Sequence, residues 1–216
     1  MSGTSALVKR ALAEAGPEEA VGAAEGLAAY LDLLLRANEE MNLVSRKEAE
    51  PEALVRRHLL EALEGLALVP APAERPLRLL DIGSGGGFPA IPLLLVRRDL
   101  AGTLVESTGK KARFLEAVAR ELGLGVTVVG DRFPVPAVGR LKGGARFDLL
   151  TSRAVAGAGE IARQARPLLA PGAIGLLWTS EPLLPGLRGA LPGAALEFRR
   201  SPGAERRGIA RVKRFT

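Results

Sequence analysis

The chain has 216 residues, of which 47% are hydrophobic and 25% charged, so it is long enough for one well-buried domain with a small additional segment. It has no cysteine, which excludes disulfides and thiolate metal sites, and its single histidine argues against a transition-metal centre. No apolar run reaches membrane-spanning length, and the N-terminal region lacks a signal-peptide pattern. We therefore expect a cytoplasmic protein without a metal and without a membrane association.

The formal net charge of +6 is unevenly distributed along the chain. Residues 1–70 carry −5, residues 71–150 carry +4 and residues 151–216 carry +7. A basic body behind an acidic N-terminal segment favours a polyanionic partner such as nucleic acid. A generic solubilising surface would give the same composition, so charge alone leaves both interpretations open.

The first 70 residues have the apolar spacing of helices. Leu27, Leu31 and Leu34 recur at helical intervals, and a further helix is expected from about Pro51. The segment 69–73 contains two prolines, which end any helix and indicate a linker. The sequence therefore predicts a helical N-terminal extension over residues 1–70 and a second unit over residues 71–216.

From Leu77 onward, strand and helix patterns alternate. Helices are expected to begin near Pro89, Lys110 and Ala158. Strands are expected at Arg78–Ile82, Thr103–Glu106, Val126–Val129, Asp148–Thr151 and Ala173–Trp178, with a terminal hairpin from Leu196–Phe198 and Ile209–Phe215. Such alternation predicts an α/β fold with a parallel sheet covered by helices on both faces. The intervening segment 181–193, which contains several prolines, is expected to be loose.

A glycine-rich turn directly follows the first strand of this unit. The strand ends near Asp81, and Gly83, Gly85 and Gly87 then alternate before apolar residues resume at Ala90. Glycines allow the backbone to turn tightly and to approach a ligand without an intervening Cβ atom. A strand, a glycine loop and a helix N-terminus together are typical of a nucleotide cofactor site.

The order of residues around the turn favours one cofactor over another. The dinucleotide pattern GxGxxG fails from Gly83, because its sixth position is Phe88. An acid at the strand end before alternating glycines suits S-adenosylmethionine, whose ammonium group needs an acceptor such as Asp81. Glu106 follows the next strand about 20 residues later, where an acid binds a ribose diol. A nicotinamide cofactor and an oxidoreductase activity stay open at this point.

Several short motifs then carry a resemblance to a known family. They are, in chain order, Met41-Asn42-Leu43-Val44-Ser45, Arg57-His58-Leu59-Leu60-Glu61-Ala62, Asp81-Ile82-Gly83-Ser84-Gly85-Gly86-Gly87-Phe88-Pro89, Glu106-Ser107-Thr108-Gly109-Lys110-Lys111-Ala112-Arg113-Phe114-Leu115 and Thr151-Ser152-Arg153-Ala154. Over roughly residues 25–178 the chain resembles the bacterial 16S ribosomal RNA guanine-N7 methyltransferases, also called the glucose-inhibited division protein B family.

The resemblance implies a fold, a reaction and a partner. The fold is a seven-stranded, Rossmann-like class I methyltransferase sheet with an N-terminal helical extension. The reaction moves a methyl group from S-adenosylmethionine to N7 of a guanosine in the 530 loop of 16S rRNA. The partner is 16S rRNA or the small ribosomal subunit, and we expect a monomer.

The site residues follow from the loop pattern and from the resemblance together. The expected cofactor-binding residues are Asp81, Gly83, Gly85, Phe88, Glu106, Gly130, Asp131, Arg132 and Arg153. Clustered positive charge at the start of a helix and in the C-terminal hairpin indicates RNA contacts by Lys110, Lys111, Arg113, Arg206, Arg207 and Arg211, with solvated surface side chains as the open alternative. No catalytic base is expected, because N7 of guanine has an in-plane lone pair and no proton; Arg153 is the one candidate for a catalytic role.

Three alternatives remain at this stage. They are a methyltransferase of small molecules, an NAD-dependent oxidoreductase and a catalytically silent RNA-binding protein with the same fold. The single tryptophan, Trp178, is interpreted as a core residue rather than a stacking platform for a flipped base, and His58 as a packing residue rather than a base.

Overall fold

The computed structural model describes residues 3–134, 146–153 and 157–215, and Ala154 of the fifth motif lies outside them. A sheet of seven strands forms the centre of the molecule, in the order β3-β2-β1-β4-β5-β7-β6. The strands are β1 (Leu77–Ile82), β2 (Leu100–Val105), β3 (Val126–Val129), β4 (Phe147–Arg153), β5 (Leu169–Ser180), β6 (Ala195–Arg200) and β7 (Arg207–Lys213). Strands β1 to β5 are parallel, whereas β7 is antiparallel to both β5 and β6. The predicted α/β class and the C-terminal hairpin are confirmed.

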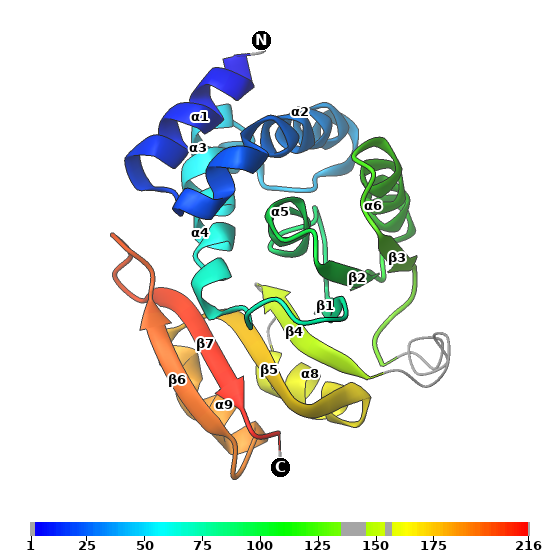
Figure 1. The fold of residues 1–216 in the computed structure, drawn as a ribbon, viewed down its shortest axis with the longest axis vertical. Helices are drawn as coiled ribbons and strands as arrows, with labels where there is room; N and C mark the ends of the chain where they lie inside the picture. Colours follow the sequence, from blue (N-terminus) through cyan, green and yellow to red (C-terminus); the bar gives the residue numbers. More distant parts are fainter. Residues whose placement is uncertain (1–2, 135–145, 154–156, 216) are drawn as a thin grey trace.

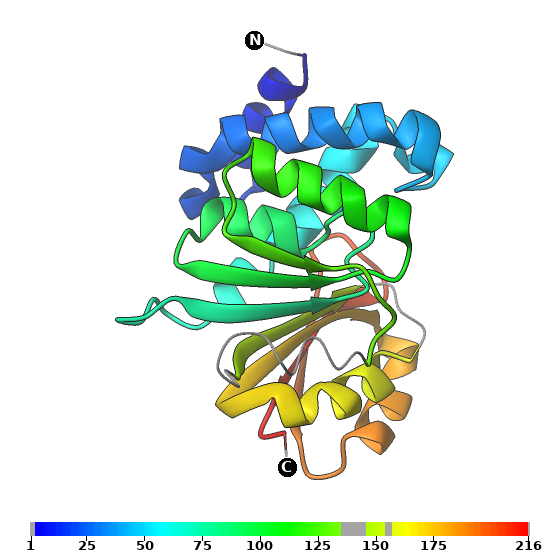
Figure 2. The same ribbon diagram turned by 90° about the vertical axis from the view of Figure 1, so that its right-hand side faces the viewer.

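Helices cover both faces of the sheet (Figures 1 and 2). They are α1 (Gly3–Ala15), α2 (Ala24–Met41), α3 (Pro51–Leu54), α4 (Leu60–Leu63), α5 (Ala90–Val96), α6 (Gly109–Glu121), α8 (Ala158–Ala165) and α9 (Leu184–Ala190). Helices α5 and α6 lie on one face beneath the N-terminal helices, and α8 and α9 lie on the other. Within the part of the chain that the structure describes, no helix is both long and apolar enough to span a bilayer.

Each face of the sheet has its own hydrophobic core, because successive side chains of a strand point to opposite faces. Leu79 of β1 packs into the hydrophobic cluster shared with the N-terminal helices, α5 and α6. The next residue, Leu80, packs into the cluster shared with α8 and α9. Strands β4 and β5 repeat the pattern. Strands buried on both faces read as continuous apolar runs, as this sequence does.

Strand β5 and the segment 181–193 differ most from the sequence-based expectation, whereas β2 starts three residues earlier than predicted, at Leu100. Strand β5 begins at Leu169, four residues before the predicted start, and its pairing with β4 is irregular next to Phe147. Pro171 has no N–H to donate to a neighbouring strand, and it lies where the regular pairing with β4 is interrupted. The segment 181–193, expected to be loose, contains the helix α9 instead. Proline is compatible with a first helical turn, and Leu187 of α9 is buried in the second core.

The N-terminal extension contacts the glycine loop directly. Tyr30 of α2 is fully buried, and its hydroxyl donates a hydrogen bond of 2.7 Å to the carbonyl oxygen of Gly86. The same hydrophobic cluster contains residues from both sides of the linker at 69–73. The helices therefore form part of the wall against which the loop is built. The division of the chain at residue 70 stays a prediction.

Replacing Tyr30 with phenylalanine tests this contact. The Y30F variant keeps the ring and leaves the buried Gly86 carbonyl without its donor, which typically costs about 1–3 kcal/mol. We expect the free energy of unfolding, measured by urea denaturation, to fall by that amount with an unchanged slope. A midpoint equal to that of the unmodified protein would show that the hydrogen bond does not hold the loop.

Candidate active site

The predicted cofactor residues gather at one edge of the sheet. The glycine loop follows β1, Glu106 follows β2, the turn at 130–132 follows β3, and Arg153 ends β4. Because these strands are parallel, their carboxyl ends meet at the same edge. The strand order reverses between β1 and β4, and ligands of such sheets bind at that switch point.

The glycine loop has a backbone that other residues rarely adopt. Gly83, Gly85 and Gly87 have φ angles of 77°, 56° and 104°, in the left-handed region that favours glycine. A Cβ atom at Gly87 would lie 2.7 Å from Cγ1 of Ile91, so this glycine is needed for packing. At Gly85 the nearest atom would be 3.8 Å away. Gly85 therefore presents its backbone to open space, as a cofactor-binding loop requires.

Glu106 ties the end of β2 to this loop. Its side chain is buried, and one carboxylate oxygen accepts a hydrogen bond of 2.8 Å from the N–H of Gly85. The other oxygen accepts one of 2.7 Å from the N–H of Thr108. Each oxygen retains a second lone pair. Glu106 can therefore hold the loop and still accept hydrogen bonds from a diol.

Asp81 is a buried acid with one unsatisfied oxygen. It is 1% exposed, and Oδ1 accepts a hydrogen bond of 2.6 Å from Thr151 Oγ1. Among the residues that the structure describes, nothing donates a hydrogen bond to Oδ2. Burial, assisted by the nearby charge of Glu106, raises the pKa of Asp81 to about 6. Such an orphaned acceptor next to the loop fits a ligand that brings a cationic N–H donor.

Arg153 is held by the N-terminal extension. Its Nη2 donates to Oε2 of Glu61 at 2.7 Å and to the carbonyl oxygen of Arg57 at 3.0 Å. Arg57 lies in a single π-helical turn over Val55–Leu59, a feature frequent at functional sites. Burial lowers the pKa of Arg153, whereas the charge of Glu61 opposes that shift. The structure thus places Arg153 in a salt bridge at the end of β4, beside the loop.

Aromatic packing completes this corner of the site. The ring of Phe88 lies 5.3 Å from those of Tyr30 and His58, measured between centroids, and the Arg153 guanidinium lies 5.8 Å from its centroid. Trp178 is buried, and its Nε1 donates to the carbonyl oxygen of Glu61 at 2.8 Å. Trp178 is thus a core residue, as expected. The contributions of Tyr30 and Glu61 were missed from sequence, although Glu61 belongs to one of the motifs.

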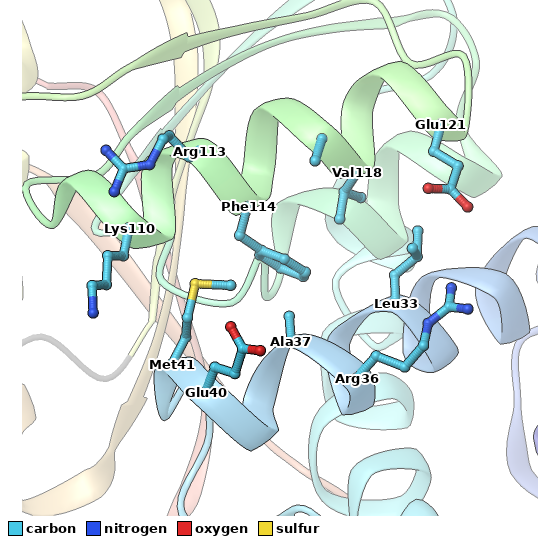
Figure 3. A pocket seen from close by; sticks show the side chains of 11 residues that line it. Leu33, Arg36, Ala37, Glu40, Met41, Lys110, Arg113, Phe114, Val118 and Glu121 are labelled. Carbon is cyan, nitrogen blue, oxygen red and sulfur yellow. The ribbon is translucent and has the colours of Figure 1, made fainter.

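The residues expected to contact RNA fall into two groups. Lys110 and Arg113 of α6 line a groove of about 800 Å³ between α2 and α6, together with Glu40 and Met41 of α2 (Figure 3). Lys111 is on the same helix but does not line the groove. The other group, Arg206, Arg207 and Arg211, lies in the C-terminal hairpin or the turn before β7, away from α6 (Figure 1). The structure does not join the two groups into one patch.

No group of three or more His, Cys, Asp or Glu side chains in the described ranges is arranged to hold a metal ion. The site is instead a glycine loop, two acids and an arginine at a switch point.

Solved structures with the same fold are methyltransferases or related enzymes. A 16S rRNA N2 G1207 methyltransferase from T. thermophilus, in complex with AdoMet and guanosine, is 19% identical with a TM-score of 0.53, over 73% of this chain and 43% of that one. A precorrin-6y C5,15-methyltransferase from Geobacter metallireducens is 15% identical with a TM-score of 0.52, over 66% and 81%. The fold is that of the class I methyltransferases.

Sequence comparison then defines the family. The model of the GidB family, rRNA small subunit methyltransferase G, matches residues 23–181. A ribosomal RNA small subunit methyltransferase G from Acidiphilium cryptum is 37% identical over 187 residues, which are 85% of this chain and 81% of that protein. One from Leptothrix cholodnii is 38% identical over 150 residues, 69% of this chain and 66% of that protein. The chain belongs to the rRNA small subunit methyltransferase G family and is an S-adenosylmethionine-dependent methyltransferase. The oxidoreductase alternative is therefore wrong.

His58 makes the stability of this site depend on pH. Burial, followed by the charge of Arg153, lowers the pKa of His58 to about 4. The unfolded chain therefore binds more protons than the folded one between about pH 4 and 6.5, and His58 destabilises the fold as the pH falls through that window. Asp81, whose pKa is raised to about 6, acts in the opposite direction between about pH 4 and 6.

The H58Q variant separates the effect of His58 on stability from that of Asp81. Asp81 contributes the same pH dependence to the unmodified protein and to H58Q, so it cancels in their difference. We expect the free energy of unfolding of the unmodified protein, relative to H58Q, to rise from pH 4 to pH 7 by up to about 3 kcal/mol. Denaturant unfolding at several pH values measures this difference. A difference that stays constant with pH would contradict a buried, neutral histidine.

Proposed function

We propose that the chain transfers a methyl group from S-adenosylmethionine to N7 of a guanosine in the 530 loop of 16S rRNA. Membership of the rRNA small subunit methyltransferase G family supports the ribosomal substrate. The observation that carries the proposal is the glycine loop clasped by Glu106 at the switch point of the sheet. We further propose that the protein acts as a monomer in the cytoplasm.

The residues at the sheet edge fit the cofactor group by group. The exposed backbone of Gly83 and the open space at Gly85 would let the methionine part approach, and its ammonium would satisfy the orphaned Oδ2 of Asp81. Glu106 would accept the ribose hydroxyls, and the exposed turn at 130–132 would border the adenine. Phe88 and Arg153 would close the site on the side of the N-terminal helices. When bound, S-adenosylmethionine supplies an electrophilic methyl group on a sulfonium.

The proposed reaction needs positioning rather than proton transfer. N7 of guanine presents a lone pair without a proton, so no side chain has to act as a general base. Holding the two reactants in line and excluding water can supply a large share of the rate enhancement. The low pKa of His58 keeps its imidazole neutral near pH 7. It therefore adds no positive charge at the edge of the site.

Arginines near the site would orient the RNA. Nη1 of Arg207 lies 3.5 Å from Oε2 of Glu61, the same oxygen that pairs with Arg153. The C-terminal hairpin therefore reaches the residues proposed to bind the cofactor. Arg206 and Arg211 would extend this contact along the hairpin, and Lys110, Lys111 and Arg113 would contact a separate stretch of RNA. Such phosphate contacts position a nucleic acid and give binding its salt dependence.

Mapping of modified bases tests the proposed reaction. Small subunits or 16S rRNA lacking the modification are incubated with the protein and S-adenosylmethionine, and the RNA is digested and analysed by mass spectrometry. We expect one new N7-methylguanosine, located in the 530 loop. A methyl group at another guanine atom would refute the N7 assignment, and RNA that stays unmodified while small molecules are methylated would favour the small-molecule alternative. Cofactor binding without turnover on the RNA would contradict the proposed reaction.

Replacing Gly85 with valine tests the cofactor site. A branched side chain at this position faces the ligand, so we expect the G85V variant to lose at least tenfold in affinity for S-adenosylmethionine, measured by calorimetry. Gly123 provides a matched control, because it also has a positive φ of 60° and open space around it, but lies after α6. The G123V variant carries comparable backbone strain and should bind normally. If G85V binds S-adenosylmethionine as tightly as G123V and the unmodified protein do, the loop does not bind the cofactor.

A further inference from the structure

A basic cleft lies at the opposite edge of the sheet from the proposed cofactor site. It has a volume of about 580 Å³ and is lined by Arg146, Arg163, Arg166 and Arg214, together with residues 169–173 at the start of β5. Strand β4 separates the two edges: it runs for seven residues from Phe147 to Arg153, or about 20 Å at the usual rise. This arginine cleft is therefore distinct from the active site.

The charge of the cleft is one-sided. None of the described residues that line it is acidic. Arg163 is paired with Glu160 on its own helix, whereas Arg146 donates to the carbonyl oxygens of Pro167 and Leu169 at 3.4 and 3.2 Å. Carbonyl oxygens fix the guanidinium of Arg146 without neutralising its charge. Several cations held around one cavity create a local positive potential that attracts an anion.

The backbone at Arg214 supports a functional role for this cleft. Its φ is 56°, a left-handed conformation uncommon for a residue with a side chain, and such residues cluster at ligand sites. The neighbouring Phe215 packs closely against Gly175 of β5, where a Cβ atom would lie 2.9 Å from its ring. Phe215 is thus anchored, and the adjacent Arg214 lines the cleft.

We propose that the arginine cleft binds phosphate groups of the RNA backbone, as a contact remote from the methylated base. The proposal rests on the proposed function, which provides a polyanion long enough to reach both edges. Arginine favours phosphate because its planar fork binds two oxygens at once. Clusters of arginines are a recurring means of recognising phosphate. This contact fixes the orientation of the RNA and reads no base.

The test removes two charges without removing the anchored arginines. In the R166Q/R214N variant both exposed side chains lose their charge, and asparagine tolerates the left-handed backbone at position 214. The matched control, R98Q/R120Q, removes two exposed charges elsewhere. Binding of 16S rRNA is measured at several salt concentrations by filter retention, and binding of S-adenosylmethionine by calorimetry.

We expect R166Q/R214N to bind the RNA roughly tenfold more weakly at low salt. The slope of log affinity against log salt should become shallower by about 1.5, because two phosphate contacts are lost. Cofactor affinity should not change, and the control should resemble the unmodified protein. A slope and affinity equal to those of the control would overturn the proposal.

Two further results distinguish an RNA contact from a site for a free anion and from a failure of the proposed function. If inorganic phosphate raises the melting temperature of the unmodified protein but not of R166Q/R214N, while RNA binding is unaffected, the cleft binds only a free anion and the RNA contact is refuted. If the unmodified protein binds S-adenosylmethionine but no RNA, the proposed substrate is wrong, and the cleft proposal fails with it. If the unmodified protein binds RNA and R166Q/R214N binds it with the same affinity and salt dependence, the proposed function stands and only this inference is refuted.

Discussion

The rest of the site depends on the hydrogen bonds that hold the glycine loop in one conformation. Three glycines with positive φ give the loop its shape, but glycine loses more conformational freedom on folding than any other residue. The loop therefore needs partners outside itself. Glu106 holds it from the sheet through the N–H of Gly85, and Tyr30 holds it from the N-terminal helices through the carbonyl of Gly86. The loop is therefore held from both sides by contacts within the protein.

The second tie between the two parts of the chain is electrostatic. Glu61 accepts hydrogen bonds from Arg153 and, through its backbone, from Trp178, and so joins the N-terminal extension to β4 and β5. A buried ion pair gains little net stability, because both charges lose their hydration. The pair is better understood as fixing where the guanidinium lies. The N-terminal extension thus shapes the site from two sides and is more than an attached segment.

Much of the fold could be predicted because its signals are local. The apolar runs of β1 and β4, the alternating glycines and the acid at Glu106 are all visible within short windows of sequence. Contacts between distant segments have no such signal. The partnership of Tyr30 with Gly86 joins positions 56 residues apart, and the separation of Lys110 from the C-terminal arginines depends on the sheet order. The helix α9 was missed because its one proline, Pro185, was interpreted as a helix breaker, although it lies in the first turn, where a helix tolerates proline.

Hydrogen exchange with and without S-adenosylmethionine tests most directly the claim that the N-terminal helices and the sheet edge form one site. Tyr30 of α2 and Glu106 after β2 both hydrogen-bond to the glycine loop. Ligand binding should therefore stabilise the loop, α2 and the end of β2 together. The account predicts slower exchange in the glycine loop, at residues 106–108 and in α2 around Tyr30, with little change in β6. Protection confined to the loop and β2, with α2 unaffected, would contradict it.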